Sequence, residues 1–328
     1  MSRRLVGLAA ALVANFSAAT GWAQLSPSAE REYEKFERLP PHRAFAVAGD
    51  GRVYYWSRVS GADPGNAVAS ALKSCADAHN RTCTLYAVNN VVLQGRPWQR
   101  IFPAPLPEIG RLRPETYWLN RGPQAAAGLI VWSHGYKSGT DSSLNAPQGE
   151  VTNFTLGGYD LYRFDRPLIV DWHRDAMDLA NAVRTARAMG YRRVVLSGQS
   201  AGAWVSLAAL GHGAPVDGVV SISAAHHGEV KNMRDPAFAR SEWRKLMEAI
   251  RPGPRLVLVQ FAGDTFDVGG RMKIAYDVLT PAGVQAIIIN HPQGFEGHYA
   301  GAVPAFPLKF GACIDTFIQT GSRQAPCI

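Results

Sequence analysis

The stretch Gly198-Gln199-Ser200-Ala201-Gly202 decides the fold of this chain. An apolar strand pattern precedes it at 193–197, and an apolar helical run follows it at 203–210. A serine in the pattern G-x-S-x-G, between a strand and a helix, is typical of a nucleophile elbow. The sharp turn strains the serine backbone, so small residues must flank it. The sequence therefore predicts that the Ser200 hydroxyl stands above a sheet edge, at a helix N-terminus that favours negative charge.

Apolar strand patterns recur through the second part of the chain and alternate with helical patterns. Runs that are apolar at every residue are typical of strands buried on both faces. Strands that alternate with helices imply an α/β fold, with a mostly parallel central sheet and helices on both faces. Strands are predicted at 128–133, 159–163, 193–197, 216–222, 255–261 and 284–290, helices at 172–189, 203–210 and 236–250, and an edge strand near 116–119.

Four stretches occur in an order that resembles one superfamily. His134-Gly135 follows the strand at 128–133, and the elbow comes next. Asp264 lies in the turn after the strand at 255–261, and Gly297-His298 lies in a late loop. Together they resemble the α/β-hydrolase superfamily of serine hydrolases, which includes esterases, lipases and dienelactone hydrolases. The resemblance covers residues 96–328 and implies that this segment is the catalytic domain.

The resemblance implies a catalytic triad. Ser200 is the expected nucleophile, His298 the general base and Asp264 the carboxylate that orients the base. Asp267, three residues further on, is the alternative acid. His298 matches the late Gly-His position of the superfamily, whereas His291 lies too close to the end of a strand.

An oxyanion hole is implied in the same way. By the superfamily's pattern, its two backbone N–H groups come from Tyr136 and Ala201. Gly135 then allows the backbone to approach the reacting carbonyl closely.

The expected function is therefore that of a serine hydrolase, which cleaves a carboxylic ester, or an amide, through an acyl-enzyme. Its expected substrate is a small-molecule or polymeric ester, and no cofactor or metal is expected. Two alternatives stay open at this point. One is an acyltransferase or peptidase that uses the same triad, and the other is a noncatalytic binding protein on a hydrolase scaffold.

The N-terminal residues 1–23 resemble a secretory signal peptide. Arg3 and Arg4 precede a short apolar region, and Gly21-Trp22-Ala23 places small residues at the cleavage positions. A secreted or periplasmic protein without an integral membrane span is expected; the alternative is a retained N-terminal anchor. The net charge of +8 becomes +6 when Arg3 and Arg4 are removed, and the basic residues form no dense tract. Nucleic acid is therefore not an expected partner.

Between the signal peptide and the catalytic domain, a leader at 24–43 and a small α+β module at 44–95 are predicted. Asp50-Gly51 and Asn89-Asn90 predict two hairpins. Between them Asp63 is expected to cap a helix that begins at Pro64, which gives a ββαββ unit. The unit resembles small cysteine-paired modules of secreted bacterial proteins. It is interpreted either as a binding domain or as a structural cover on the hydrolase.

The chain has four cysteines and no metal-binding spacing of cysteine and histidine. Two local disulfides, Cys75–Cys83 and Cys313–Cys327, are the simplest of the three possible pairings. Adjacent His226 and His227 have no spaced metal-binding partner and are expected to line the pocket or its rim. The sequence does not decide whether two further sets of residues face the substrate or have a structural role. They are the aromatic residues Trp132, Tyr136, Trp172 and Trp204 and the basic residues Arg163 and Arg166.

Overall fold

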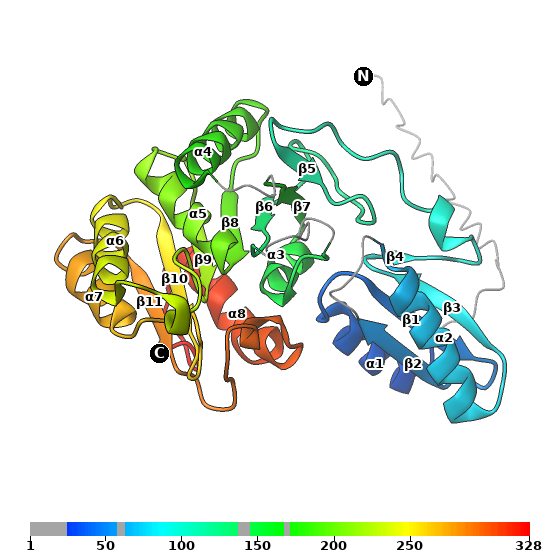
Figure 1. Ribbon diagram of the computed structural model, residues 1–328. Helices are drawn as coiled ribbons and strands as arrows, with labels where there is room; N and C mark the ends of the chain where they lie inside the picture. Colours follow the sequence, from blue (N-terminus) through cyan, green and yellow to red (C-terminus); the bar gives the residue numbers. More distant parts are fainter. Residues whose placement is uncertain (1–24, 58–62, 137–144, 167–170) are drawn as a thin grey trace, which may run out of the picture.

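A computed structural model describes residues 25–57, 63–136, 145–166 and 171–328 (Figure 1). The predicted signal peptide at 1–23 lies outside these residues. These described residues form a four-stranded sheet in the N-terminal part of the chain and a seven-stranded sheet in the remainder. Among the described residues, no helix has the length and apolar character needed to cross a membrane.

The small sheet is antiparallel and has the strand order β2-β1-β3-β4. It has the predicted ββαββ order, and a further helix, α1, precedes it. The elements are α1 (Pro27–Glu37), β1 (Arg43–Ala48), β2 (Val53–Ser57), α2 (Gly65–His79), β3 (Cys83–Val88) and β4 (Val91–Val92).

Strand β1 is buried along its whole length because a helix covers each face of the small sheet. Side chains alternate across a strand, so neighbouring residues point to opposite faces. Ala44 and Ala46 pack in the core that contains Ala67 and Ala71 of α2. Phe45 packs with Phe36 of α1, at a ring-centroid distance of 5.3 Å. The leader helix α1 is therefore packed onto the module.

The predicted helix start is wrong by one residue. Helix α2 begins at Gly65 rather than Pro64, and the Gly65 N–H donates to Oδ1 of Asp63 at 2.7 Å. Asp63 therefore satisfies the exposed N–H of the first helical residue from two positions earlier.

The edge strand predicted at 116–119 is also wrong. The strand on this edge is β5 (Leu112–Pro114), which pairs antiparallel with β7. The segment 116–119 bonds to the module instead. The side-chain amide of Asn89 donates to the Tyr117 carbonyl at 2.6 Å, and the Leu119 N–H donates to Oδ1 of Asn90 at 2.9 Å.

The large sheet has the strand order β11-β10-β9-β8-β6-β7-β5, and β5 is its antiparallel edge strand. Strand β6 lies between β7 and β8, so the chain reverses its direction across the sheet there. In open α/β sheets, ligands bind beyond the carboxyl ends of strands at such a point. This arrangement is the predicted α/β-hydrolase fold. The remaining strands are β6 (Gly128–Ser133), β7 (Tyr159–Phe164), β8 (Val194–Gln199), β9 (Gly218–Ile222), β10 (Arg255–Gln260) and β11 (Ala286–Asn290).

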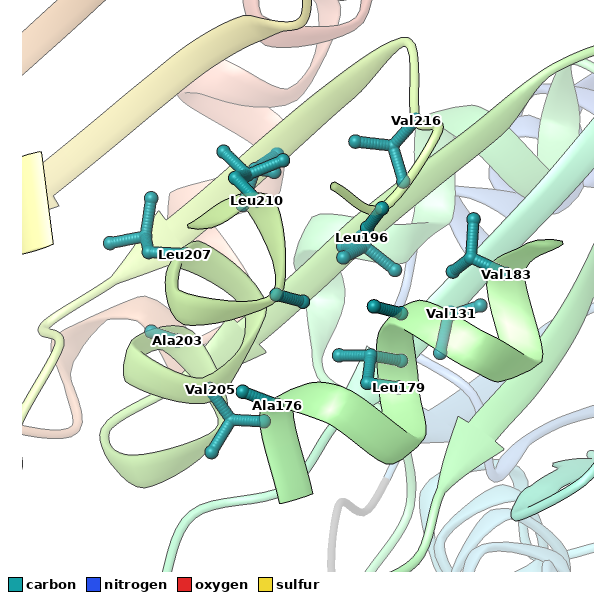
Figure 2. Packing of buried hydrophobic residues seen from close by; sticks show 14 of the residues in the cluster. Val131, Ala176, Leu179, Val183, Leu196, Ala203, Val205, Leu207, Leu210 and Val216 are labelled. Atoms are coloured by element: carbon teal, nitrogen blue, oxygen red, sulfur yellow. The ribbon is translucent and has the colours of Figure 1, made fainter. Parts of the chain in front are cut away.

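Helices cover both faces of the large sheet. One face packs against α3 (Thr152–Leu156) and α8 (Ala305–Thr320), and the other against four helices. Those four are α4 (Trp172–Ala188), α5 (Ala201–Gly211), α6 (Pro236–Glu248) and α7 (Arg271–Leu279). Figure 2 shows the core between α4, α5 and the central strands, with Leu179 of α4, Leu207 of α5 and Leu196 of β8.

Both local disulfides are present. Cys75–Cys83 joins α2 to the start of β3, and Cys313–Cys327 joins α8 to the C-terminal tail. A disulfide that closes a loop of this second length stabilises a fold by about 3 kcal/mol in the chain-entropy model.

Candidate active site

Ser200 lies at the tight turn between β8 and α5, with φ 57° and ψ −121°. This left-handed backbone is unusual for a residue with a side chain. It persists because both flanking glycines leave room for the turn. A Cβ on Gly202 would come within 1.9 Å of the Ser133 carbonyl oxygen, and one on Gly198 within 2.6 Å of the Gly202 carbonyl carbon. The local geometry is therefore that of the predicted elbow.

The loop after β11 brings His298 against Ser200. Nε2 of His298 lies 2.8 Å from Oγ of Ser200, and Nδ1 lies 2.9 Å from Oδ1 of Asp264. Ser200 and His298 are 8% and 6% exposed, so both are nearly excluded from water. These distances form a continuous hydrogen-bonded chain of carboxylate, imidazole and hydroxyl.

Asp264 follows β10 and is held in one orientation. Its Oδ2 accepts from Nε2 of Gln260 at 2.7 Å, and its Oδ1 accepts from the Phe266 N–H at 2.9 Å. Burial alone would raise the pKa of Asp264. The hydrogen bond with His298 and these two further donors outweigh that effect and hold the pKa below its usual value. Asp264 is therefore a carboxylate at neutral pH.

The two alternative residues lie elsewhere. Asp267 faces Arg271, with 3.6 Å between its Oδ1 and Nε of the guanidinium, and burial raises the pKa of Asp267. His291 is an exposed residue directly after β11, and its backbone N–H donates to the Gln260 carbonyl at 2.8 Å. The structure thus brings Ser200, Asp264 and His298 together and leaves out both alternatives.

Two backbone segments lie next to Ser200. Ala201 is the first residue of α5, so its N–H has no acceptor within the helix. Gly135, after β6, lies so close that an added Cβ would be 3.5 Å from Cβ of Ser200. Tyr136 follows and is 45% exposed. The sheet order places these segments together because β6 and β8 are neighbours.

Two contacts at this site were not predicted from the sequence. The side-chain amide of Gln199 donates to the His298 carbonyl at 3.0 Å, which fixes the backbone of that loop. Arg166 is buried, and its guanidinium donates to the His134 carbonyl. The backbone N–H of Arg166 donates to Nε2 of His134 at 3.2 Å. Gln199 occupies a variable position of the motif, and Arg166 is far from His134 in sequence, so no local pattern indicates either contact.

Two aromatic side chains lie against the His298 ring. The rings of Phe266 and Tyr299 lie 4.2 Å and 5.1 Å from the His298 ring. Trp132 is buried in the core and donates from Nε1 to Glu150 at 3.2 Å. His226 and His227 belong to no group of three or more histidine, cysteine, aspartate or glutamate residues suited to a metal, within the described part of the chain.

Several solved structures are similar to this chain. No family model matches it, and no curated protein does either. A truncated carbohydrate esterase from gut microbiota is 13% identical over 63% of this chain and 88% of its own, with a TM-score of 0.46. Esterase Est2 of Thermogutta terrifontis, with butyrate bound, is 14% identical over 70% of this chain and 99% of its own, with a TM-score of 0.47.

An acylaminoacyl peptidase of Pyrococcus horikoshii is 16% identical over 60% of this chain, with a TM-score of 0.45. This chain spans 37% of the peptidase's length. The structural neighbours are thus esterases and a peptidase with low sequence identity.

Proposed function

We propose that this protein is a serine hydrolase that cleaves a carboxylic ester through an acyl-enzyme. The observation that carries the proposal is the hydrogen-bonded chain from Asp264 through His298 to Ser200. An imidazole between a carboxylate and a serine hydroxyl is the arrangement needed to activate that hydroxyl as a nucleophile.

In the first half-reaction, Oγ of Ser200 attacks the ester carbonyl carbon and its proton passes to Nε2 of His298. The carbonyl oxygen becomes an oxyanion, which accepts hydrogen bonds from the N–H groups of Ala201 and Tyr136. The C–O bond to the alcohol then breaks, and His298 gives the proton to the leaving oxygen. The products are an ester on Ser200 and the free alcohol.

In the second half-reaction, His298 takes a proton from water, and the resulting hydroxide attacks the acyl carbon. Collapse of the second tetrahedral intermediate releases the carboxylic acid, and the proton returns to Oγ of Ser200. Asp264 remains ionised throughout, keeps Nδ1 of His298 protonated and stabilises the imidazolium. The steps balance without a cofactor, because the side chains supply the nucleophile and carry the proton.

We further propose that the protein acts outside the cytoplasm. Both pairs of cysteines form disulfides, which persist in oxidising compartments. The basic and apolar N-terminal sequence agrees with export.

The test is hydrolysis of p-nitrophenyl butyrate by the purified protein and by Ser200→Ala. We expect the variant to lose at least about 10⁴-fold in kcat, because the nucleophile is removed. Ser206→Ala is the matched control, since Ser206 is a buried serine of α5, the helix that Ser200 caps, and lies six residues further along the chain. It should keep wild-type turnover. A folded wild type that hydrolyses no ester would favour a noncatalytic binding protein. Ser200→Ala with full turnover would overturn Ser200 as the nucleophile.

A further inference from the structure

Four rings lie close together on segments that follow β7, β8 and β9 in the chain. Trp172 begins α4, Trp204 lies in the first turn of α5, and His226 and His227 follow β9. We call these four residues the ring cluster. The His226 ring lies 4.3 Å from that of Trp172 and 4.8 Å from that of Trp204. The two imidazoles stack with their centroids 4.4 Å apart.

Backbone hydrogen bonds attach the ring cluster to the candidate reacting groups. The Ser200 carbonyl accepts from the N–H groups of Trp204 and Ala225, each at 3.1 Å. The chain then continues through both histidines to Val230, whose N–H donates to the Thr265 carbonyl at 2.9 Å. Thr265 directly follows Asp264. The histidine segment therefore borders the site from the serine to the carboxylate.

The ring cluster is uncharged at neutral pH. Burial lowers the pKa of His226 to about 4; Arg271 and any protonation of His227 act in the same direction, and Glu242 acts against them. Burial likewise lowers the pKa of His227. A carboxylate or ammonium group of a ligand would find no opposite charge on these imidazoles.

The imidazoles are also not held by hydrogen bonds on their buried sides. Nδ1 of His226 and Nε2 of His227 are buried without a hydrogen-bond partner. A histidine retained for a structural hydrogen bond would use such a nitrogen. Trp172 and both histidines are only half-buried, so part of their ring surface stays accessible. An aromatic ring of a ligand can stack on, or pack edge to face against, such an uncharged and partly open set of rings.

We propose that the ring cluster binds an aromatic ring in the acyl part of the ester substrate, an inference that rests on the proposed function. The alcohol leaves beside Nε2 of His298, where Phe266 and Tyr299 flank the imidazole. The acyl group stays bonded to Ser200, the residue to which the ring cluster is attached. This makes the acyl group the part of the substrate that reaches these rings.

The first experiment compares p-nitrophenyl 3-phenylpropanoate with p-nitrophenyl 3-cyclohexylpropanoate. The two acyl groups have similar size and reactivity and differ in their π-electrons. We expect wild type to prefer the phenyl ester by about three- to tenfold in kcat/KM. The preference should fall to about one in His226→Leu and in Trp172→Leu. It should persist in His212→Leu, the matched control at the opposite end of α5.

The second experiment measures binding without turnover. Tryptophan fluorescence of Ser200→Ala is titrated with 3-phenylpropanamide and with 3-cyclohexylpropanamide. We expect tighter binding of the phenyl amide by a similar factor, and loss of that preference when His226→Leu is added.

The outcomes separate the two proposals. Ester turnover with no phenyl preference, or with a preference that both cluster variants keep, overturns the aromatic subsite and leaves the hydrolase proposal intact. Absence of all ester turnover counts against the hydrolase, and the binding experiment then decides the subsite. Equal affinity for the two amides overturns it.

Discussion

Two buried histidine–carboxylate pairs invite comparison, because they contain the same chemical groups in different surroundings. His298 and Asp264 lie 2.9 Å apart at the carboxyl edge of the large sheet. His42 and Glu115 lie 3.8 Å apart where the N-terminal module meets that sheet. Both members of the second pair are at most 2% exposed, so it is the more deeply buried of the two.

Each histidine–carboxylate pair has a third polar group beside it, and this group differs between the two pairs. His298 bonds to the Ser200 hydroxyl, whereas Glu115 has the guanidinium of Arg163 at 3.7 Å. A hydroxyl on the far side of an imidazole can lose a proton to it, whereas a guanidinium can only neutralise a carboxylate. The His42–Glu115 pair therefore lies between the module and the sheet with a guanidinium, not a nucleophile, as its third group. A histidine–carboxylate pair indicates catalysis only when a nucleophile completes it.

The largest expected effect is on kcat and comes from a substitution that breaks the His298–Asp264 pair. Asp264→Asn should lower kcat for p-nitrophenyl butyrate by about 10⁴-fold, because an amide favours the wrong tautomer of His298. Asp267→Asn makes the same chemical change three residues away, at a side chain that faces Arg271. It should change kcat by less than tenfold. Similar losses in both variants, measured in parallel on folded protein, would contradict the assignment of Asp264.

The next largest effect is on stability and comes from a substitution that breaks the His42–Glu115 pair. Glu115→Ala leaves Arg163 without this buried partner and should lower the free energy of unfolding by about 3 kcal/mol at pH 7. Urea denaturation measures the loss. Glu108→Ala is the control, since Glu108 pairs with Arg113 at the surface. An exposed pair of this kind contributes less than about 1 kcal/mol. Equal losses in the two variants would show that Glu115 does not hold the interface.

The loss from Glu115→Ala should depend on pH. Burial raises the pKa of Glu115, but the contacts with His42 and Arg163 outweigh burial and hold the pKa of this carboxyl below its usual value. Such a group stabilises the fold above its unfolded pKa and loses that effect as pH falls through its folded pKa. The difference between wild type and the variant should therefore shrink on acidification below pH 4.5.

The smallest expected change in stability concerns Glu150, a buried carboxyl whose side-chain contacts are with Trp132 and Ser197 rather than with a histidine or an arginine. Glu150 is 3% exposed, and burial raises its pKa to about 7. In the folded protein the Glu150 carboxyl therefore prefers to be protonated. Its contribution to the free energy of unfolding is lost as pH rises from the pKa of Glu150 in the unfolded chain towards 7. Glu150→Gln should be more stable than wild type at pH 8 by about 1–2 kcal/mol and equal to it at pH 4. Thermal unfolding at both pH values checks this, and parallel pH curves would contradict it.

The local elements were predictable because their causes are local. Apolar runs gave the strands of the large sheet, and turn residues gave the module's hairpins. Contacts between distant segments were not predictable. The edge strand was misplaced because Asn89 and Asn90 bind the segment 116–119, a pairing that no local pattern indicates. Asp264 and Asp267 share one turn, and only the approach of His298 from the late loop separates them.

The most direct test of the account is to map the residue that reacts with a fluorophosphonate ester. The purified protein is treated with the probe, digested and analysed by mass spectrometry, with His298→Ala treated in parallel. We expect one phosphonate on the peptide that contains Ser200, and strongly reduced labelling in the variant. Labelling at another residue, or no labelling of folded wild type, would contradict a nucleophilic Ser200.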